Sequence, residues 1–182
     1  MRSTGAHLHV VTAGPCAGKT STLRELSARG YRTCPEGARV AIDQAVSEGK
    51  DMDEFRETEE FTQRVLDEDS RAELNAIRNS SMGEHVFLDR SLADNIAYAK
   101  LYGRNIPDRV HMICEQRYDT VFVLDQLEFE TDYARTEDEE EARVVHQELI
   151  NAYEYLGYDI IEVPVKPVSE RADIIEERAL DR

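Results

Sequence analysis

The stretch Ala13-Gly14-Pro15-Cys16-Ala17-Gly18-Lys19-Thr20 decides the fold class of this chain. It follows the apolar run Leu8–Thr12 and precedes Thr20–Arg29, a segment with helical spacing that ends at Gly30. A glycine-rich turn between a strand and a helix, ending in Gly-Lys-Thr, is the pattern of a phosphate-binding Walker A loop. The sequence therefore predicts a loop whose backbone N–H groups, at a helix start, hold the phosphates of ATP or GTP.

Each position of this loop has an expected role. Lys19 is predicted to bridge the β- and γ-phosphates, and the Thr20 hydroxyl to ligate Mg²⁺. Ala13 stands where the strict pattern has glycine, which is tolerated if its backbone stays out of the positive φ region. Cys16 is interpreted as a small loop residue, because no His or second Cys is close in sequence to support a redox or nucleophilic role. The residues predicted to contact the nucleotide are Gly14, Pro15, Cys16, Ala17, Gly18, Lys19, Thr20 and Ser21.

Strand-like runs recur along the chain with helix-length segments between them. This alternation predicts an α/β fold, a parallel sheet with helices on both faces, built as a single domain over residues 1–182. The expected strands are Leu8–Thr12, Tyr31–Cys34, His85–Asp89, Thr120–Leu124 and Ile160–Val163.

The helices are expected from caps and apolar periodicity. One is predicted over Glu36–Ser47, and a single long one over Glu54–Asn79, entered through a cap at Asp51. The Ser91-Leu92-Ala93-Asp94 segment has capping-box form, and another helix is predicted to begin at Pro107. A last apolar stripe with helical spacing, which ends near Gly157, consists of Ala142, Val145, Leu149, Ala152 and Leu156.

Composition excludes several classes of function. The 182 residues carry a formal net charge of −16, which opposes general binding to nucleic acids or anionic membranes. No apolar run approaches the roughly 20 residues of a membrane span, and Met1–His7 lacks the apolar core of a secretory signal. Cys16, Cys34 and Cys114 are too scattered for a disulfide framework or a zinc site. We therefore expect a cytoplasmic protein with reduced thiols.

Three charged residues are candidates for chemistry at the carboxyl edge of the sheet. Asp89 ends an apolar strand and is predicted to hold Mg²⁺, although a strand-end Asp that caps the next helix has the same pattern. Arg90 beside it is a candidate for binding the acceptor. Glu36, after the second strand and away from the loop phosphates, is a candidate base for an acceptor hydroxyl. The alternative is a glutamate at the start of a helix, where the helix dipole stabilises its negative charge. Arg39 is expected to be a solvent-exposed helix residue.

The polar segment between the fourth strand and the last apolar stripe is a candidate lid. It covers approximately residues 125–136 and contains Arg135, which such a segment could bring onto the γ-phosphate. A surface arginine beside an acidic run is the alternative for Arg135.

With these residues in view, the chain resembles the small AAA-type P-loop domains related to nicotinamide riboside kinases and, more distantly, to thymidylate and deoxynucleoside kinases. The likeness covers nearly the whole chain. It implies a three-layer, kinase-like fold with a five-stranded parallel sheet in the order 2-3-1-4-5. It also implies a base at Glu36, metal and acceptor roles at Asp89 and Arg90, and a lid role at Arg135. The carrying segments are residues 13–20, 35–39, 87–91, 117–124 and 134–143.

Two functions follow as hypotheses. The first is a Mg²⁺- and NTP-dependent kinase that transfers the γ-phosphoryl group to a small hydroxyl-bearing metabolite such as a nucleoside or riboside. The second is a nucleotide-binding regulator that hydrolyses slowly and acts through a partner, which would need neither an acceptor-side base nor Arg90. The sequence does not decide between ATP and GTP as the preferred nucleotide, and it does not identify the acceptor. It also leaves the oligomeric state open, and a homodimer is one possibility.

Overall fold

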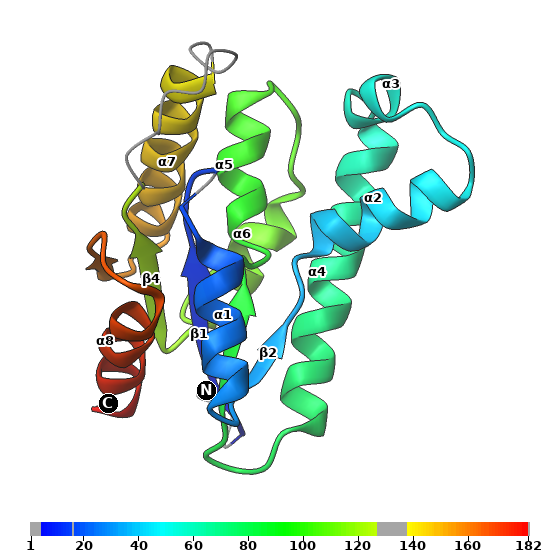
Figure 1. Cartoon of the computed structure of the whole chain (residues 1–182). Coiled ribbons are helices and arrows are strands. Elements are labelled where there is room, and N and C mark those ends of the chain that lie inside the picture. The colour runs from blue at the N-terminus through cyan, green and yellow to red at the C-terminus, as the bar shows by residue number, and fades with distance from the viewer. Residues whose placement is uncertain (1–4, 16, 127–137, 182) are drawn as a thin grey trace.

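A five-stranded parallel sheet with the strand order β2-β3-β1-β4-β5 forms the centre of the molecule (Figure 1). The computed structural model describes residues 5–15, 17–126 and 138–181. The strands are β1 (His7–Thr12), β2 (Arg32–Cys34), β3 (His85–Asp89), β4 (Thr120–Leu124) and β5 (Ile160–Val163). The helices are α1 (Lys19–Ala28), α2 (Gly37–Ser47), α3 (Met52–Arg56), α4 (Glu59–Asn79), α5 (Asp94–Leu101), α6 (Asp108–Cys114), α7 (Asp138–Tyr155) and α8 (Val168–Leu180). The α/β class and the strand order implied by the resemblance are confirmed.

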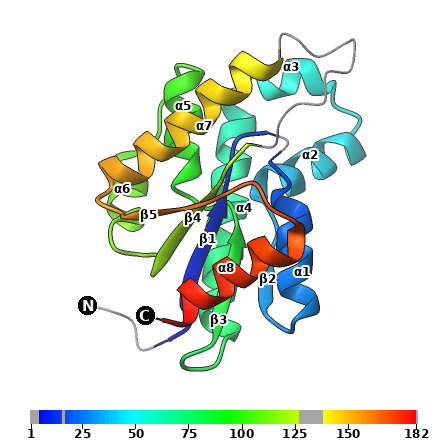
Figure 2. The ribbon, with the colours of Figure 1, turned by 60° about the vertical axis from the view of Figure 1, so that its left-hand side comes forward.

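Helices cover both faces of the sheet (Figure 2). Helices α1 and α8 pack on one face, where Leu26 and Ile175 meet Phe87 and Phe122 of the strands. Helices α4, α6 and α7 pack on the other face, with the fully buried Tyr153 among their apolar side chains. Because both faces are covered, the central strands are near-continuous apolar runs, as parallel sheets require.

The order of the strands places the loop after β1 beside the end of β3. Strand β1 pairs with β3 on one side and β4 on the other, and Val11 stands opposite Asp89 in the register. Parallel strands end at one common edge, so the segments after β1, β2 and β3 all leave from that edge. The fold thereby brings Lys19, Glu36 and Arg90 together.

Most predicted elements are confirmed to within one or two residues, and one helix prediction is wrong. The expected long helix Glu54–Asn79 is two helices, because Thr58 accepts a hydrogen bond from the Phe61 N–H at 3.1 Å and caps α4 separately. Asp51 caps the short α3 before it. The apolar stripe of α7 is confirmed, since all five of its predicted residues are buried. Helix α8 lies beyond the last predicted element.

None of the helices in the described ranges combines the length and the apolarity needed to cross a bilayer.

Candidate functional site

Glycines at two positions shape the loop between β1 and α1. Gly18, the N-cap of α1, has a φ of 76°, a left-handed conformation that glycine adopts without strain. A Cβ added at Gly14 would lie 2.7 Å from Gln126 Nε2 and 2.8 Å from the carbonyl oxygen of Ala142. Ala13 is buried and, unlike Arg90 and Gln116, has no positive φ, so alanine is tolerated there as expected. Cys16 lies outside the described residues.

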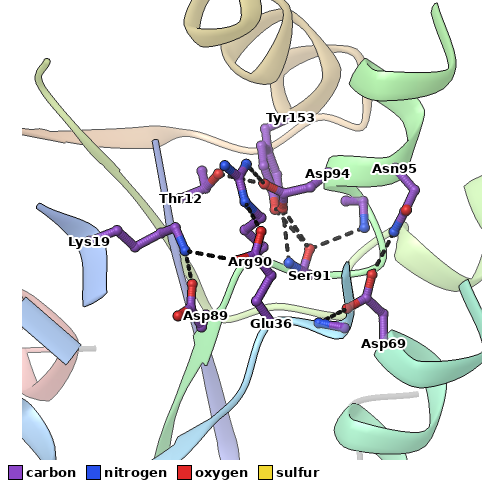
Figure 3. Close-up of polar contacts among 12 residues, drawn as sticks. Thr12, Lys19, Glu36, Asp69, Asp89, Arg90, Ser91, Asp94, Asn95 and Tyr153 are labelled. Atoms are coloured by element: carbon purple, nitrogen blue, oxygen red, sulfur yellow. Dashed lines mark hydrogen bonds and ion pairs between the residues drawn. The ribbon is translucent and has the colours of Figure 1, made fainter. Parts of the chain in front are cut away.

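Lys19 meets two carboxylates from other elements (Figure 3). Its Nζ forms an ion pair with Asp89 Oδ1 at the end of β3 and lies 3.9 Å from Glu36 Oε2. Burial, followed by the nearby charge of Arg90, lowers the pKa of Lys19 to about 8. Glu36 is therefore closer to the loop lysine than predicted, and it lies between Lys19 and Arg90.

Arg90 is held between carboxylates in an uncommon backbone conformation. Its Nε donates to Glu36 Oε1 at 2.7 Å, and its Nη1 lies 3.4 Å from Asp94 Oδ1. The guanidinium also lies 5.2 Å from the centre of the Tyr98 ring. The φ of Arg90 is 63°, a left-handed value that costs a non-glycine residue roughly 1–2 kcal/mol. Such strain persists where the surroundings fix a side chain for a purpose, which agrees with a functional position for Arg90.

Asp94 organises the inner part of this network, a role that the sequence analysis did not assign. The carboxylate is buried, accepts from Thr12 Oγ1 at 2.5 Å and from the Ser91 N–H at 2.9 Å, and also accepts from the Tyr153 hydroxyl. The reach back to Ser91 explains the capping-box pattern. The contacts with Thr12 and Tyr153 span 82 and 59 residues of sequence and fix Arg90 indirectly.

A second buried carboxylate stands near the network. Asp69 of α4 accepts from the Gly37 N–H at 3.0 Å and from Asn95 Nδ2 at 2.7 Å. Burial raises the pKa of Asp69 to about 7. A Cβ at Gly37 would lie 2.2 Å from Asp69 Oδ1, so glycine is required where α2 begins.

One cavity of about 780 Å³ is lined by four of the charged residues described above, Glu36, Asp69, Arg90 and Asp94. Its volume falls within the roughly 300–1,000 Å³ typical of small-molecule sites. Its lining includes Pro15 of the loop and the aromatic side chains of Phe61 from α4 and Tyr98 from α5. The lining thus combines the loop with charged and aromatic side chains, among them Pro15, Glu36, Asp69, Arg90, Asp94 and Tyr98.

The remaining predicted residues lie apart from the cavity or outside the described ranges. Thr20 and Ser21 are exposed at the start of α1. Arg39 is exposed, as expected, and pairs with Asp43 at 3.3 Å. Arg135 and most of the candidate lid at 125–136 lie outside the described residues, so their assignment stays a prediction.

Within the described ranges, no group of three His, Cys, Asp or Glu residues is arranged to hold a metal ion alone. The Thr20 hydroxyl and the Asp89 carboxylate are hard oxygen donors. Mg²⁺ commonly combines one or two such donors with substrate phosphates and water. The two residues therefore fit a metal that arrives with the nucleotide.

Comparison with known proteins agrees with this geometry. A family model described as an AAA domain matches residues 8–171. No curated protein matches the chain in sequence. Among solved structures, NadR in complex with NAD and AMP-PNP is 18% identical with a TM-score of 0.66, over 96% of this chain and 48% of NadR. The chain thus spans about half the length of NadR.

Two nucleotide-metabolising kinases share the fold over nearly their whole length. Deoxyadenosine kinase from M. mycoides, with the products dCMP and dCDP, is 16% identical with a TM-score of 0.59, over 96% of this chain and 100% of the kinase. Thymidylate kinase from Candida albicans is 12% identical with a TM-score of 0.61, over 98% of this chain and 93% of the kinase. At these identities the likeness establishes a P-loop kinase-like fold.

Proposed function

The chain belongs to the AAA domain family, and from this premise we propose that it is a Mg²⁺- and NTP-dependent kinase for a small hydroxyl-bearing metabolite. One observation carries the proposal. Glu36, on the wall of a metabolite-sized cavity, lies 2.7 Å from Arg90 and 3.9 Å from the loop lysine Lys19. A carboxylate between a phosphate-binding loop and a cavity is where a kinase needs the base for its acceptor.

The reaction assigns each group a part. Glu36 accepts the proton of the acceptor hydroxyl, whose oxygen then forms a bond to the γ-phosphorus. The bond between that phosphorus and the β–γ bridging oxygen breaks, and the nucleoside diphosphate leaves. Lys19 exchanges Asp89 for phosphate oxygens and balances their negative charge. Thr20 and Asp89 would hold Mg²⁺, which would supply positive charge to offset the negative charge that develops on the phosphates.

The charge network holds the Glu36 carboxylate in place beside the cavity. Arg90 donates to Glu36 Oε1, while Oε2 faces Lys19, so both oxygens of the carboxylate lie near positive charge. Asp94 in turn holds Arg90 from the far side, which keeps the guanidinium from leaving the site. An acceptor hydroxyl would enter beside Glu36, with its remaining atoms in the cavity.

The cavity and the relatives favour an acceptor of the nucleoside or riboside class. Tyr98 and Phe61 offer flat apolar surfaces, and Asn95 and Asp69 offer hydrogen-bonding groups in the same cavity. A sugar with an attached ring needs both kinds of contact. The ligands bound in the structural relatives, NR in NadR and deoxynucleotides in the deoxyadenosine kinase, belong to the same chemical range.

The direct experiment measures release of nucleoside diphosphate with Mg²⁺ and either ATP or GTP, in the presence of a panel of nucleosides, ribosides and sugars. We expect at least one acceptor to raise the rate well above basal hydrolysis, with a phosphorylated product visible by mass spectrometry. The Arg39→Gln variant is the matched control for Glu36→Gln, because Arg39 lies near Glu36 in sequence but is exposed. If nucleotide binds and no acceptor accelerates turnover, the kinase proposal fails and a nucleotide-dependent regulator becomes the better account.

A further inference from the structure

A buried guanidinium lies against the phosphate-binding loop on the side of α8. Arg171 is 3% exposed, and its Nη1 donates to the carbonyl oxygen of Ala17 at 2.8 Å. The guanidinium packs so closely on Gly18 that a Cβ there would lie 2.8 Å from Nη1 and 2.9 Å from Nη2. Helix α8 thus places a positive charge in contact with the N-cap residue of α1.

The charge of Arg171 has no counter-ion within the described part of the chain. No carboxylate there forms an ion pair with it, and its buried Nε has no hydrogen-bond partner. Burial lowers the pKa of this arginine, and no nearby charge offsets the effect. Placing an unpaired charge in the interior is costly, so its position against the loop calls for an explanation.

Arg117 provides the contrast within the same molecule. Its side chain is also mostly buried, but its Nε forms an ion pair with Glu73, and Glu73 accepts further hydrogen bonds from Tyr118 and the Leu92 N–H. Arg117 therefore belongs to a neutralised structural network. Arg171 is buried as well, but no carboxylate of the described residues neutralises its charge.

We propose that Arg171 is a positioning residue for the nucleotide, whose positive charge is balanced by the polyphosphate when the loop is occupied. This inference rests on the nucleotide-binding part of the proposed function, not on the transfer reaction. A triphosphate brings several negative charges to the loop that Arg171 touches through Ala17 and Gly18. The unpaired guanidinium disfavours the empty loop and favours the filled one, so it raises the affinity for phosphates without necessarily touching them.

The proposal predicts an unusual pair of effects for Arg171→Met, which keeps an apolar chain of similar length and removes the charge. The ligand-free protein should unfold at an unchanged or higher temperature, because a buried unpaired charge has been removed. Affinity for a non-hydrolysable Mg²⁺-triphosphate should fall on the order of tenfold. Affinity for the bare nucleoside, which lacks phosphates, should stay the same. Arg171→Lys retains the charge and should recover most of the triphosphate affinity.

The matched control is Arg117→Met, which leaves Glu73 buried without its partner. It should lower the unfolding temperature strongly and leave the dissociation constant for the triphosphate unchanged.

Thermal unfolding without ligand and calorimetric titration with the triphosphate analogues of ATP and GTP measure both effects. The inference is overturned if Arg171→Met binds the triphosphate as tightly as the parent, if it weakens the nucleoside equally, or if it unfolds without ligand as Arg117→Met does. A parent protein that binds neither analogue would remove the nucleotide-binding function itself, and this inference with it. Retained binding in the parent with unchanged binding in Arg171→Met would remove only the inference.

Discussion

The two ends of the central strands β1 and β3 both carry ionisable side chains, yet they are built in opposite ways. At the carboxyl ends, Lys19, Asp89 and their neighbours form a network of opposite charges beside a cavity. At the amino ends, His7, His9 and His85 stack on one another with ring centres 4.9 to 6.5 Å apart. A cluster of titratable groups is therefore not a site by itself; what matters is whether it faces a space that a ligand can enter.

The two ends shift the pKa values of their side chains in opposite directions. Burial raises the pKa of Asp69 at the cavity and lowers the pKa of His85 at the far end, so both environments favour the neutral form of a buried group. At the carboxyl edge, Asp94 accepts hydrogen bonds from Thr12 Oγ1 and the Ser91 N–H. The stacked histidines make a hydrogen bond of 2.8 Å between His9 Nε2 and His85 Nδ1, which needs one N–H and one lone pair.

The largest effect is expected from Glu36→Gln, which should slow acceptor-dependent turnover by about 10²–10⁴-fold, the usual contribution of a positioned base. Because Glu36 Oε2 lies 3.9 Å from Lys19, a small change in nucleotide affinity is also expected. Steady-state rates against acceptor concentration measure the first effect, and calorimetric titration measures the second. If Glu36→Gln turned over at the parent rate, Glu36 would have no part in the reaction. The carboxyl ends of the strands would then have no base to distinguish them from the amino ends.

Lys19→Met should remove the stabilisation of the fold by Mg²⁺-nucleotide. A ligand at a hundredfold excess over its Kd adds about 2.7 kcal/mol to the free energy of unfolding, and that increment should vanish. The ligand-free variant should remain folded, since the ion pairs of Lys19 are with the site carboxylates Asp89 and Glu36 and not with a structural network elsewhere in the described residues. Lys50→Met is the control, because Lys50 pairs with Glu60 on the surface and should leave the nucleotide effect intact. Full nucleotide stabilisation in Lys19→Met would contradict the loop assignment.

Tyr153→Phe tests the inner support of the network. Removing the hydroxyl takes one donor from the buried Asp94 carboxylate, and a hydrogen bond to a charged group contributes about 1.5–3 kcal/mol. The free energy of unfolding in urea should fall by that amount. Tyr155→Phe on the same helix should have no effect, because Tyr155 is 76% exposed. Equal stability of the two variants would show that Asp94 does not depend on Tyr153.

The smallest effect is expected at the histidine end. Since the folded state lowers the pKa of His85 below its ordinary 6.5, the unfolded chain binds the proton more readily. The contribution of His85 to the free energy of unfolding should therefore be fully present above pH 6.5 and be lost as the pH falls through the pKa of His85 in the folded state. Asp69 acts in the opposite sense, since its raised pKa of about 7 costs stability as the pH rises towards 7.

His85→Asn should flatten the acid arm of the curve of unfolding free energy against pH. The control is His111→Asn, at a histidine that lies against Tyr155, outside the stack. An unchanged acid arm in His85→Asn would mean that the stacked rings do not contribute to acid sensitivity.

The carboxyl edge could be anticipated from sequence where the signal is local. Strands β3, β4 and β5 have the predicted bounds, because each is a short apolar run between polar turns. The loop and Lys19 follow from one continuous motif. Asp94 could not be recognised as part of the site, since its local pattern already explains it as a cap and its partners Thr12 and Tyr153 are distant in sequence.

The break before α4 and the helix α8 were not predicted, and the reasons are similar. The break before α4 depends on Thr58, whose capping role competes with the helical propensity of the residues around it. Helix α8 carries Arg171 within its buried face, beside Ala172 and Ile175, and this charge interrupts the apolar stripe by which an amphipathic helix is recognised. In both places, a polar residue whose partner cannot be read from the sequence decides the outcome.

The most direct test of the account follows the γ-phosphate itself. The protein is incubated with Mg²⁺ and γ-labelled ATP or GTP together with the nucleoside and riboside panel, and the label is traced by chromatography. The account predicts that label appears in a phosphorylated acceptor with the parent protein and is greatly reduced with Glu36→Gln. Label found only in inorganic phosphate, at a rate that no acceptor changes, would contradict it.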